Sequence, residues 1–133
     1  HQTVYEEFPL PRLVFRFTLD KDGRVLNKRL GVIPDEIPNV KTIMYHYPFS
    51  NVNGFQICTG NNALPRYKEL RSVGSLPHYI LSMPNNDDYF NASRNKLGLG
   101  YRDLLEHLKD KTPEYYNQEI LIPNGKTLQN FIN

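Results

Sequence analysis

The amino-acid sequence predicts an α+β domain in which an antiparallel sheet is followed by helices. The first part of the chain alternates apolar and polar residues around an Asp-Gly turn, as the strands of a hairpin do. Later segments carry apolar residues at helical spacing, and strands that precede helices favour an α+β fold. The length of 133 residues suits a single domain over residues 1–133. Because the chain begins with His1 rather than Met, a fragment of a longer protein is also an expectation.

The first two predicted strands form a hairpin. From Arg12 to Leu19 every second side chain is apolar, which predicts a half-buried strand. Asp22-Gly23 supplies the positive φ that a tight hairpin turn needs, and the returning strand is expected from Arg24 to Leu30. A loop that contains two prolines is expected over residues 31–38.

Two more strands are predicted beyond this loop. Residues 40–47 are rich in β-branched and aromatic side chains, which favour a third strand. Residues 55–58 form either a short fourth strand or extended chain. Strands that follow one another in this way predict an antiparallel meander.

Helices are predicted in the second half of the chain. Residues 66–73 and 78–83 are helical candidates, which Gly74 and Pro77 separate, and a polar surface loop is expected over residues 84–93. The clearest helix is expected from Tyr101 to Lys109, where apolar residues recur at i, i+3, i+4 and i+7. The remaining expectations are a short helix that begins at Thr112-Pro113, a strand-like run over 119–122 and a closing helix over 126–132.

Charge and cysteine content exclude several functional classes. The formal net charge is +2, from 16 basic and 14 acidic residues, and no long basic run favours nucleic-acid binding. One cysteine cannot form an intrachain disulfide, and no Cys/His cluster has zinc spacing, so we expect a reducing compartment, no metal and no cofactor. No apolar run has the length of a membrane span or a signal peptide, so a cytoplasmic protein without a membrane partner is expected.

The single cysteine, Cys58, lies between two segments that are expected to turn. Asn51-Val52-Asn53-Gly54 precedes it and Thr59-Gly60-Asn61-Asn62 follows it. Most lone cysteines are small buried apolar residues. A polar, glycine-containing surrounding instead favours a thiol near the surface, where backbone N–H groups can stabilise a thiolate or an oxyanion.

Other polar residues are candidate partners of this thiol. Asn51 either serves the backbone of the turn or donates a hydrogen bond to a developing oxyanion, and Asp87 and Asp88 are either a solvated turn or groups that orient an incoming amine. A cysteine hydrolase would need a histidine within hydrogen-bond reach of the thiol, and none of the histidines stands in a protease motif. The three internal histidines are His46, His78 and His107.

The segment around Cys58 resembles the active-site region of ubiquitin-conjugating enzymes. The resemblance is carried by Tyr47-Pro48-Phe49-Ser50-Asn51-Val52-Asn53-Gly54-Phe55-Gln56-Ile57-Cys58-Thr59-Gly60. It is greatest to prokaryotic ubiquitin-conjugating family D, which includes the PRTRC system protein B and has an Asn-Val-Tyr-x-x-Gly-x-Val-Cys-x-Gly-like core. A later segment of that family resembles Ile122-Pro123-Asn124-Gly125-Lys126-Thr127-Leu128. The likeness is greatest over residues 34–65 and 119–132.

This resemblance implies a fold and a chemistry. The fold would be ubiquitin-conjugating-like, with an antiparallel four-strand meander, an active-site loop and C-terminal helices. Cys58 would carry a ubiquitin-like modifier as a thioester, received from an adenylating activating enzyme, and transfer it to an amine, with Asn51 stabilising the oxyanion. The alternative is a non-catalytic interaction scaffold of the same fold in a mobile-element protein complex.

The sequence also departs from the eukaryotic ubiquitin-conjugating enzymes. Pro48-Phe49-Ser50 stands where their motif has a histidine, a departure that family D shares. The first helix of those enzymes is not visible before Pro9. Asp87 and Asp88 stand in a Pro-Asn-x-Asp-Asp segment like one that follows the cysteine in the eukaryotic enzymes.

Overall fold

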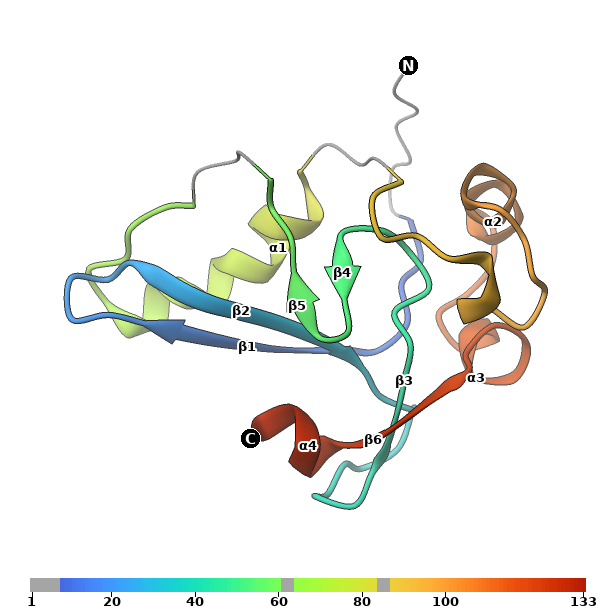
Figure 1. The fold of residues 1–133 in the computed structure, drawn as a ribbon, viewed down its shortest axis with the longest axis horizontal. Coiled ribbons are helices and arrows are strands. Elements are labelled where there is room, and N and C mark those ends of the chain that lie inside the picture. Colours follow the sequence, from blue (N-terminus) through green and yellow to red (C-terminus); the bar gives the residue numbers. More distant parts are fainter. Residues whose placement is uncertain (1–7, 61–63, 84–86) are drawn as a thin grey trace.

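The computed structural model describes residues 8–60, 64–83 and 87–133 (Figure 1). Within these ranges the strands are β1 (Leu13–Leu19), β2 (Val25–Val32), β3 (Ile43–Tyr45), β4 (Val52–Asn53), β5 (Gln56–Ile57) and β6 (Pro123–Thr127). The helices are α1 (Leu76–Leu81), α2 (Tyr101–Leu108), α3 (Tyr115–Glu119) and α4 (Leu128–Ile132), with 3₁₀ turns at Leu70–Ser75 and Ala92–Arg94. The predicted α+β class, with an antiparallel sheet and helices toward the C-terminus, is confirmed.

The predicted hairpin of β1 and β2 is present, and its turn explains why the sequence has glycine there. Gly23 has a φ of 80°, and a Cβ at this position would lie 1.6 Å from the carbonyl oxygen of Tyr67. The carboxylate of Asp20 accepts the N–H groups of Arg24 and Asp22, and the bond from Arg24 is the main cause that lowers the pKa of Asp20. The turn is therefore closed locally and touches the chain that follows Cys58.

The order of the strands differs from the expected four-strand meander. Strand β2 pairs with β1 along one edge, and its other edge is shared by β5, through Arg29 and Gln56, and β3, through Val32 and Tyr45. The C-terminal strand β6 lies beside β3, and the β4–β5 hairpin returns to β2 (Figure 1). The meander prediction is therefore wrong beyond β3. Pro48 lacks the N–H that would extend β3, so the chain leaves the sheet soon after Tyr45.

Apolar side chains cover both faces of this curled sheet. On one face, Leu30, Val52 and Ile57 form a cluster to which the strand β1 contributes phenylalanines and α1 contributes Ile80. On the other face, Met44 of β3 and Phe131 of α4 pack over Gly31. A third cluster joins the sheet to α2 and α3 and consists of Val32, Phe49, Leu104, Leu108, Tyr116, Ile120 and Leu121.

Several boundaries differ from the sequence predictions. Strand β2 extends to Val32, so the predicted loop starts later, and the third strand is limited to Ile43–Tyr45 because the flanking residues leave the ladder. A 3₁₀ helix runs through Gly74, where an interruption is predicted. Helix α3 begins after its predicted cap, at Tyr115.

The predicted strand-like run over 119–122 is mostly not a strand. Helix α3 ends at Glu119, Leu121 forms an isolated bridge with Asn95, and the strand β6 begins at Pro123. Asn61 and Asn62 of the second predicted turn, and residues 84–86 of the predicted loop, lie outside the described residues. Across the part of the chain that is described, no helix is both long and apolar enough to span a membrane.

Candidate functional site

The β4–β5 hairpin places Asn51 and Cys58 opposite each other. Its register pairs Val52 with Ile57, and its two-residue loop begins at Gly54, whose φ is 62°. The next pair outward is Asn51 and Cys58, and the N–H of Cys58 donates to the carbonyl of Asn51 at 2.7 Å. The hairpin thus brings together two residues that the sequence analysis selected.

Asn51 connects this hairpin to Asp88. In a regular ladder, a hydrogen-bonded pair exchanges two N–H···O bonds. Here the N–H of Asn51 donates to the carbonyl of Asp88 at 2.7 Å, while Asn51 has a φ of 66°. Asparagine tolerates this left-handed conformation better than most residues. The backbone of the second candidate segment therefore lies directly against the thiol hairpin.

The residues after Asp88 are held in place by Arg94. Tyr89 has a φ of 62°, and it is, with Asn51, one of two non-glycine residues with positive φ in the described ranges. The guanidinium of Arg94 donates through Nη1 to the carbonyl of Tyr89 at 3.1 Å and to the carbonyl of Val52 at 3.3 Å. A left-handed conformation in a bulky residue persists only where surrounding contacts hold it. Arg94 supplies such a contact between the hairpin and residues 87–89, and the sequence analysis did not identify it.

The thiol and the amide are both available for chemistry. Cys58 is a free cysteine of intermediate exposure, and Asn51 is also partly exposed. Neither side chain makes a hydrogen bond to another described residue. The carboxyl-bearing residues Asp87 and Asp88 are exposed. The site therefore combines an accessible thiol, an amide donor and nearby acidic residues.

Buried aromatic residues anchor the chain that leads into this site. Phe49 packs edge-to-face with Tyr47 and Tyr116, at ring-centroid distances of 5.5 and 6.3 Å. The hydroxyl of buried Ser50 donates to the hydroxyl of Tyr101 at 3.2 Å. Burial raises the pKa of the Tyr47 phenol far above its ordinary value, and the neighbouring Tyr101 adds to this effect. Residues 47–50 thus fix the position from which Asn51 departs.

The three internal histidines are not partners of the thiol within the described residues. His107 shares a hydrogen bond with the hydroxyl of Tyr115 at 2.8 Å, and His78 is exposed on α1. Burial, followed by the charge of Arg94, lowers the pKa of His46. Among the residues that the structure covers, no histidine ring is hydrogen-bonded to Cys58. The Cys–His pair that a cysteine hydrolase requires is therefore not formed there.

Metal ligands do not gather in the described ranges, where no three His, Cys, Asp or Glu side chains are arranged to hold a metal ion. Cys58 and Asp88 are neighbours through Asn51 but supply only two such groups.

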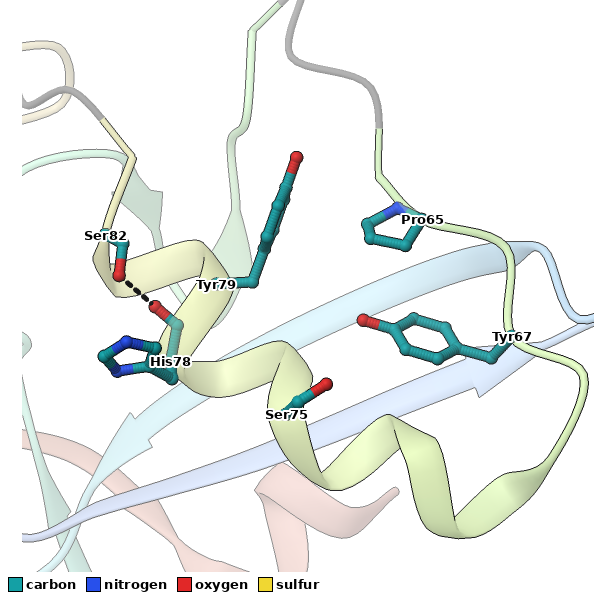
Figure 2. Close-up of a pocket in the computed structure, with 6 residues that line it drawn as sticks. All are labelled: Pro65, Tyr67, Ser75, His78, Tyr79 and Ser82. Atoms are coloured by element: carbon teal, nitrogen blue, oxygen red, sulfur yellow. Dashed lines mark hydrogen bonds between the residues drawn. The ribbon is translucent and has the colours of Figure 1, made fainter.

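A pocket of about 380 Å³ lies between α1 and the chain that follows Cys58 (Figure 2). Tyr67 points from the chain near Pro65 toward α1, Tyr79 projects from α1 on the opposite side of the space, and the ring of His78 points away from both (Figure 2). The hydroxyl of Ser82 donates to the carbonyl of His78 at 2.7 Å, and that of Ser75 to Ser72 at 2.9 Å. The walls are thus mainly apolar, and Cys58 is not among the lining residues.

Comparison of this chain with known protein families, with curated proteins and with solved structures found no match.

Proposed function

We propose that this protein is a bacterial ubiquitin-conjugating-like enzyme that carries a ubiquitin-like modifier as a thioester on Cys58. The observation that supports this most is the pairing of Asn51 with Cys58 across the β4–β5 hairpin. The backbones of the two residues are thus joined, and both residues are partly exposed, which supports a shared role for the amide and the thiol.

The proposed reaction is a thioester exchange followed by acyl transfer. The thiolate of Cys58 attacks the thioester carbonyl of the loaded activating enzyme. A new C–S bond to Cys58 forms, and the thiolate of the activating enzyme leaves. A substrate amine then attacks the Cys58 thioester, the C–S bond breaks, and the amine loses a proton as the amide forms. Both steps pass through an oxyanion that the Asn51 amide would stabilise. Because the acyl group arrives activated, a strongly held base is not required.

Asp87 and Asp88 are proposed to orient the incoming amine. The carbonyl of Asp88 accepts the N–H of Asn51, whose own carbonyl accepts the N–H of Cys58, so this segment lies against the backbone of the thiol hairpin. An exposed carboxylate close to an ammonium favours its approach and can accept its proton. The partners would be the modifier protein, its adenylating activating enzyme and an amine-bearing acceptor, in the cytoplasm.

The fold is proposed to be a variant of the ubiquitin-conjugating fold. Supporting features are the early antiparallel strands, the short hairpin directly before the cysteine, and the helices that follow it. The strand β6 beside β3 would be a departure of this variant.

The test is reconstitution with ATP and with each candidate pair of adenylating activating enzyme and ubiquitin-like modifier from the source genome. We expect an adduct that a reducing thiol removes and that does not form in Cys58→Ala. In Asn51→Ala the adduct should form at least about tenfold more slowly, because loss of one oxyanion donor typically lowers the rate by more than this. Asn27→Ala, which removes an exposed carboxamide of β2 outside both proposed sites, is the control and should keep the rate.

The interaction scaffold is the outcome that would replace this proposal. A scaffold would form no adduct, and its Cys58 would react with a small alkylating reagent only after denaturation. An enzyme of the proposed kind would be alkylated in the folded state, because its thiolate must be reachable.

A further inference from the structure

A row of polar side chains crosses four neighbouring strands of the sheet. The register places Arg16 of β1 opposite Arg29 of β2, Arg29 opposite Gln56 of β5, and Gln56 opposite Asn53 of β4. Directly opposed residues point to the same face of a sheet. We call these four residues the polar row. Since neighbouring strands lie about 4.8 Å apart, the row is about 15 Å long.

The polar row lies on the face of the sheet that carries α4. The guanidinium of Arg29 is 5.0 Å from the ring centroid of Phe55 and 5.3 Å from that of Phe131, which belongs to α4. The adjacent Leu30 instead packs with Ile80 of α1, on the opposite face. Arg16, Gln56 and Asn53 are exposed, so the row borders α4 without being covered by it.

The two arginines of the row lack a counterion. Like charges that are directly opposite in an antiparallel pair destabilise it. In the described ranges, neither Arg16 nor Arg29 forms an ion pair, and the side chains of Arg16, Gln56 and Asn53 make no hydrogen bond. An anionic group between the two guanidiniums would relieve this repulsion and accept charge-assisted hydrogen bonds.

Arg29 is already ordered for such a contact. Its Nη1 donates to the carbonyl of Phe131 at 2.5 Å, and the guanidinium also lies against the rings of Phe55 and Phe131, which pack edge-to-face with each other. Ordering a free arginine side chain on binding costs conformational entropy, and here most of that loss has occurred on folding. Arg16 is exposed and can move to meet a ligand.

We propose that the polar row binds an acidic peptide segment of a partner protein, with a carboxylate held between Arg16 and Arg29. The neutral amides of Gln56 and Asn53 extend the row, and an amide both donates to and accepts from a peptide backbone. A phosphate-rich polymer would instead favour further cations along the row. This proposal does not depend on the thioester chemistry of Cys58.

The test is an NMR titration of the full chain with a peptide of six glutamates, at low ionic strength. We expect amide shifts centred on the polar row, none with a peptide of six glutamines, and weaker binding as salt is added. Arg16→Gln should weaken binding about tenfold, the loss expected for a hydrogen bond between charged groups. This residue is exposed, so the variant should fold, which its circular dichroism checks.

Lys28→Gln is the matched control. It also removes one positive charge from the hairpin, but Lys28 lies opposite Phe17 on the other face of the sheet, so binding should change less than twofold. Equal weakening by both variants, shifts away from the polar row, or no binding of the glutamate peptide would overturn the proposal. Shifts of the row with inorganic phosphate but not with the peptide would also overturn it, in favour of a phosphate-bearing ligand.

Discussion

At the scale of single residues, Arg94 determines how the candidate site is assembled. Its guanidinium bonds two carbonyls from segments that are far apart in sequence, at Val52 and at Tyr89. Each of these lies beside or at a residue with positive φ, Asn51 or Tyr89. Such conformations cost of order 1–3 kcal/mol each, so contacts that hold them are needed. The positions of Asn51 and Asp88 therefore depend on Arg94, which takes no direct part in the proposed reaction.

Arg94→Met is predicted to destabilise the fold and to raise the pKa of His46. Loss of charge-assisted bonds to two carbonyls should lower the free energy of unfolding by about 2 kcal/mol, measured by urea denaturation. The pKa of His46 should rise partway toward its ordinary value, because the charge of Arg94 is the second cause, after burial, that lowers it. NMR titration of the imidazole measures this shift.

Arg94→Lys separates the two effects. The ammonium keeps the charge beside His46, but it sits on a flexible stem and is not held where the rigid guanidinium places Nη1, which bonds both carbonyls, so stability should fall while the pKa of His46 stays low. If Arg94→Met left both the free energy of unfolding and the pKa of His46 unchanged, the role assigned to Arg94 would be wrong.

At the scale of elements, the packing of α4 on the sheet depends on Gly31. Helix α4 is short, and a capping box between Thr127 and Asn130 begins it, with the carboxamide of Asn130 accepting the N–H of Thr127 at 2.8 Å. A helix of this length is not stable alone, so its buried Phe131 must supply the tertiary contact. Phe131 reaches the sheet at Gly31, where no side chain intervenes.

Gly31→Ala is predicted to displace α4. An added Cβ would lie 2.2 Å from the terminal methyl of Met44 and 3.0 Å from the ring of Phe131. Overpacking of this kind costs about 1–3 kcal/mol in the free energy of unfolding. Gly74→Ala is the control, because nothing lies within 4 Å of its added Cβ, and it should be neutral or stabilising by up to about 1 kcal/mol. Thermal denaturation of both variants decides this, and equal stability of the two would contradict it.

At the scale of the whole molecule, local patterns predict local structure and fail for distant pairings. The alternation in β1, the Asp-Gly turn and the helical spacing of α2 each involve residues within a few positions, and all three predictions are confirmed. Strand β6 pairs with β3 from the other end of the chain, and the polar segment that forms β6 has no alternation that indicates a strand. The pairing of β6 depends on backbone hydrogen bonds and on the strand beside it, β3, and a single sequence does not show which strand that will be.

The candidate site shows the same division. The Asn-Gly turn before Cys58 predicts a hairpin-like approach, so the proximity of Asn51 to the thiol follows from neighbouring residues. The contacts of Arg94 with Val52 span 42 positions, and that of Tyr116 with the carbonyl of Pro9 spans 107. No local sequence pattern predicts these contacts of Arg94 and Tyr116. An arginine after a polar loop is usually solvent-exposed, and a tyrosine in a short helix can pack in many ways.

Two tyrosines, the buried Tyr116 and the partly buried Tyr47, determine how the whole fold responds to alkali. Burial raises the pKa of both Tyr47 and Tyr116 far above the ordinary value of 10.0, and the charge of Tyr47 adds to the effect on Tyr116. The folded state therefore keeps two phenol protons that the unfolded chain releases. Their contribution to stability is complete below pH 10 and declines as the pH rises above it, by about 1.4 kcal/mol per pH unit for each tyrosine.

Alkaline titration, followed by tyrosinate absorbance and by far-ultraviolet circular dichroism, measures this response. Of the nine tyrosines, Tyr47 and Tyr116 should ionise only together with the loss of helix and sheet signal. Tyr47→Phe should reduce the dependence of stability on pH above 10 by about one proton. Complete ionisation of all tyrosines while the circular dichroism stays native would show that the aromatic anchor behind Asn51 is not sealed from water.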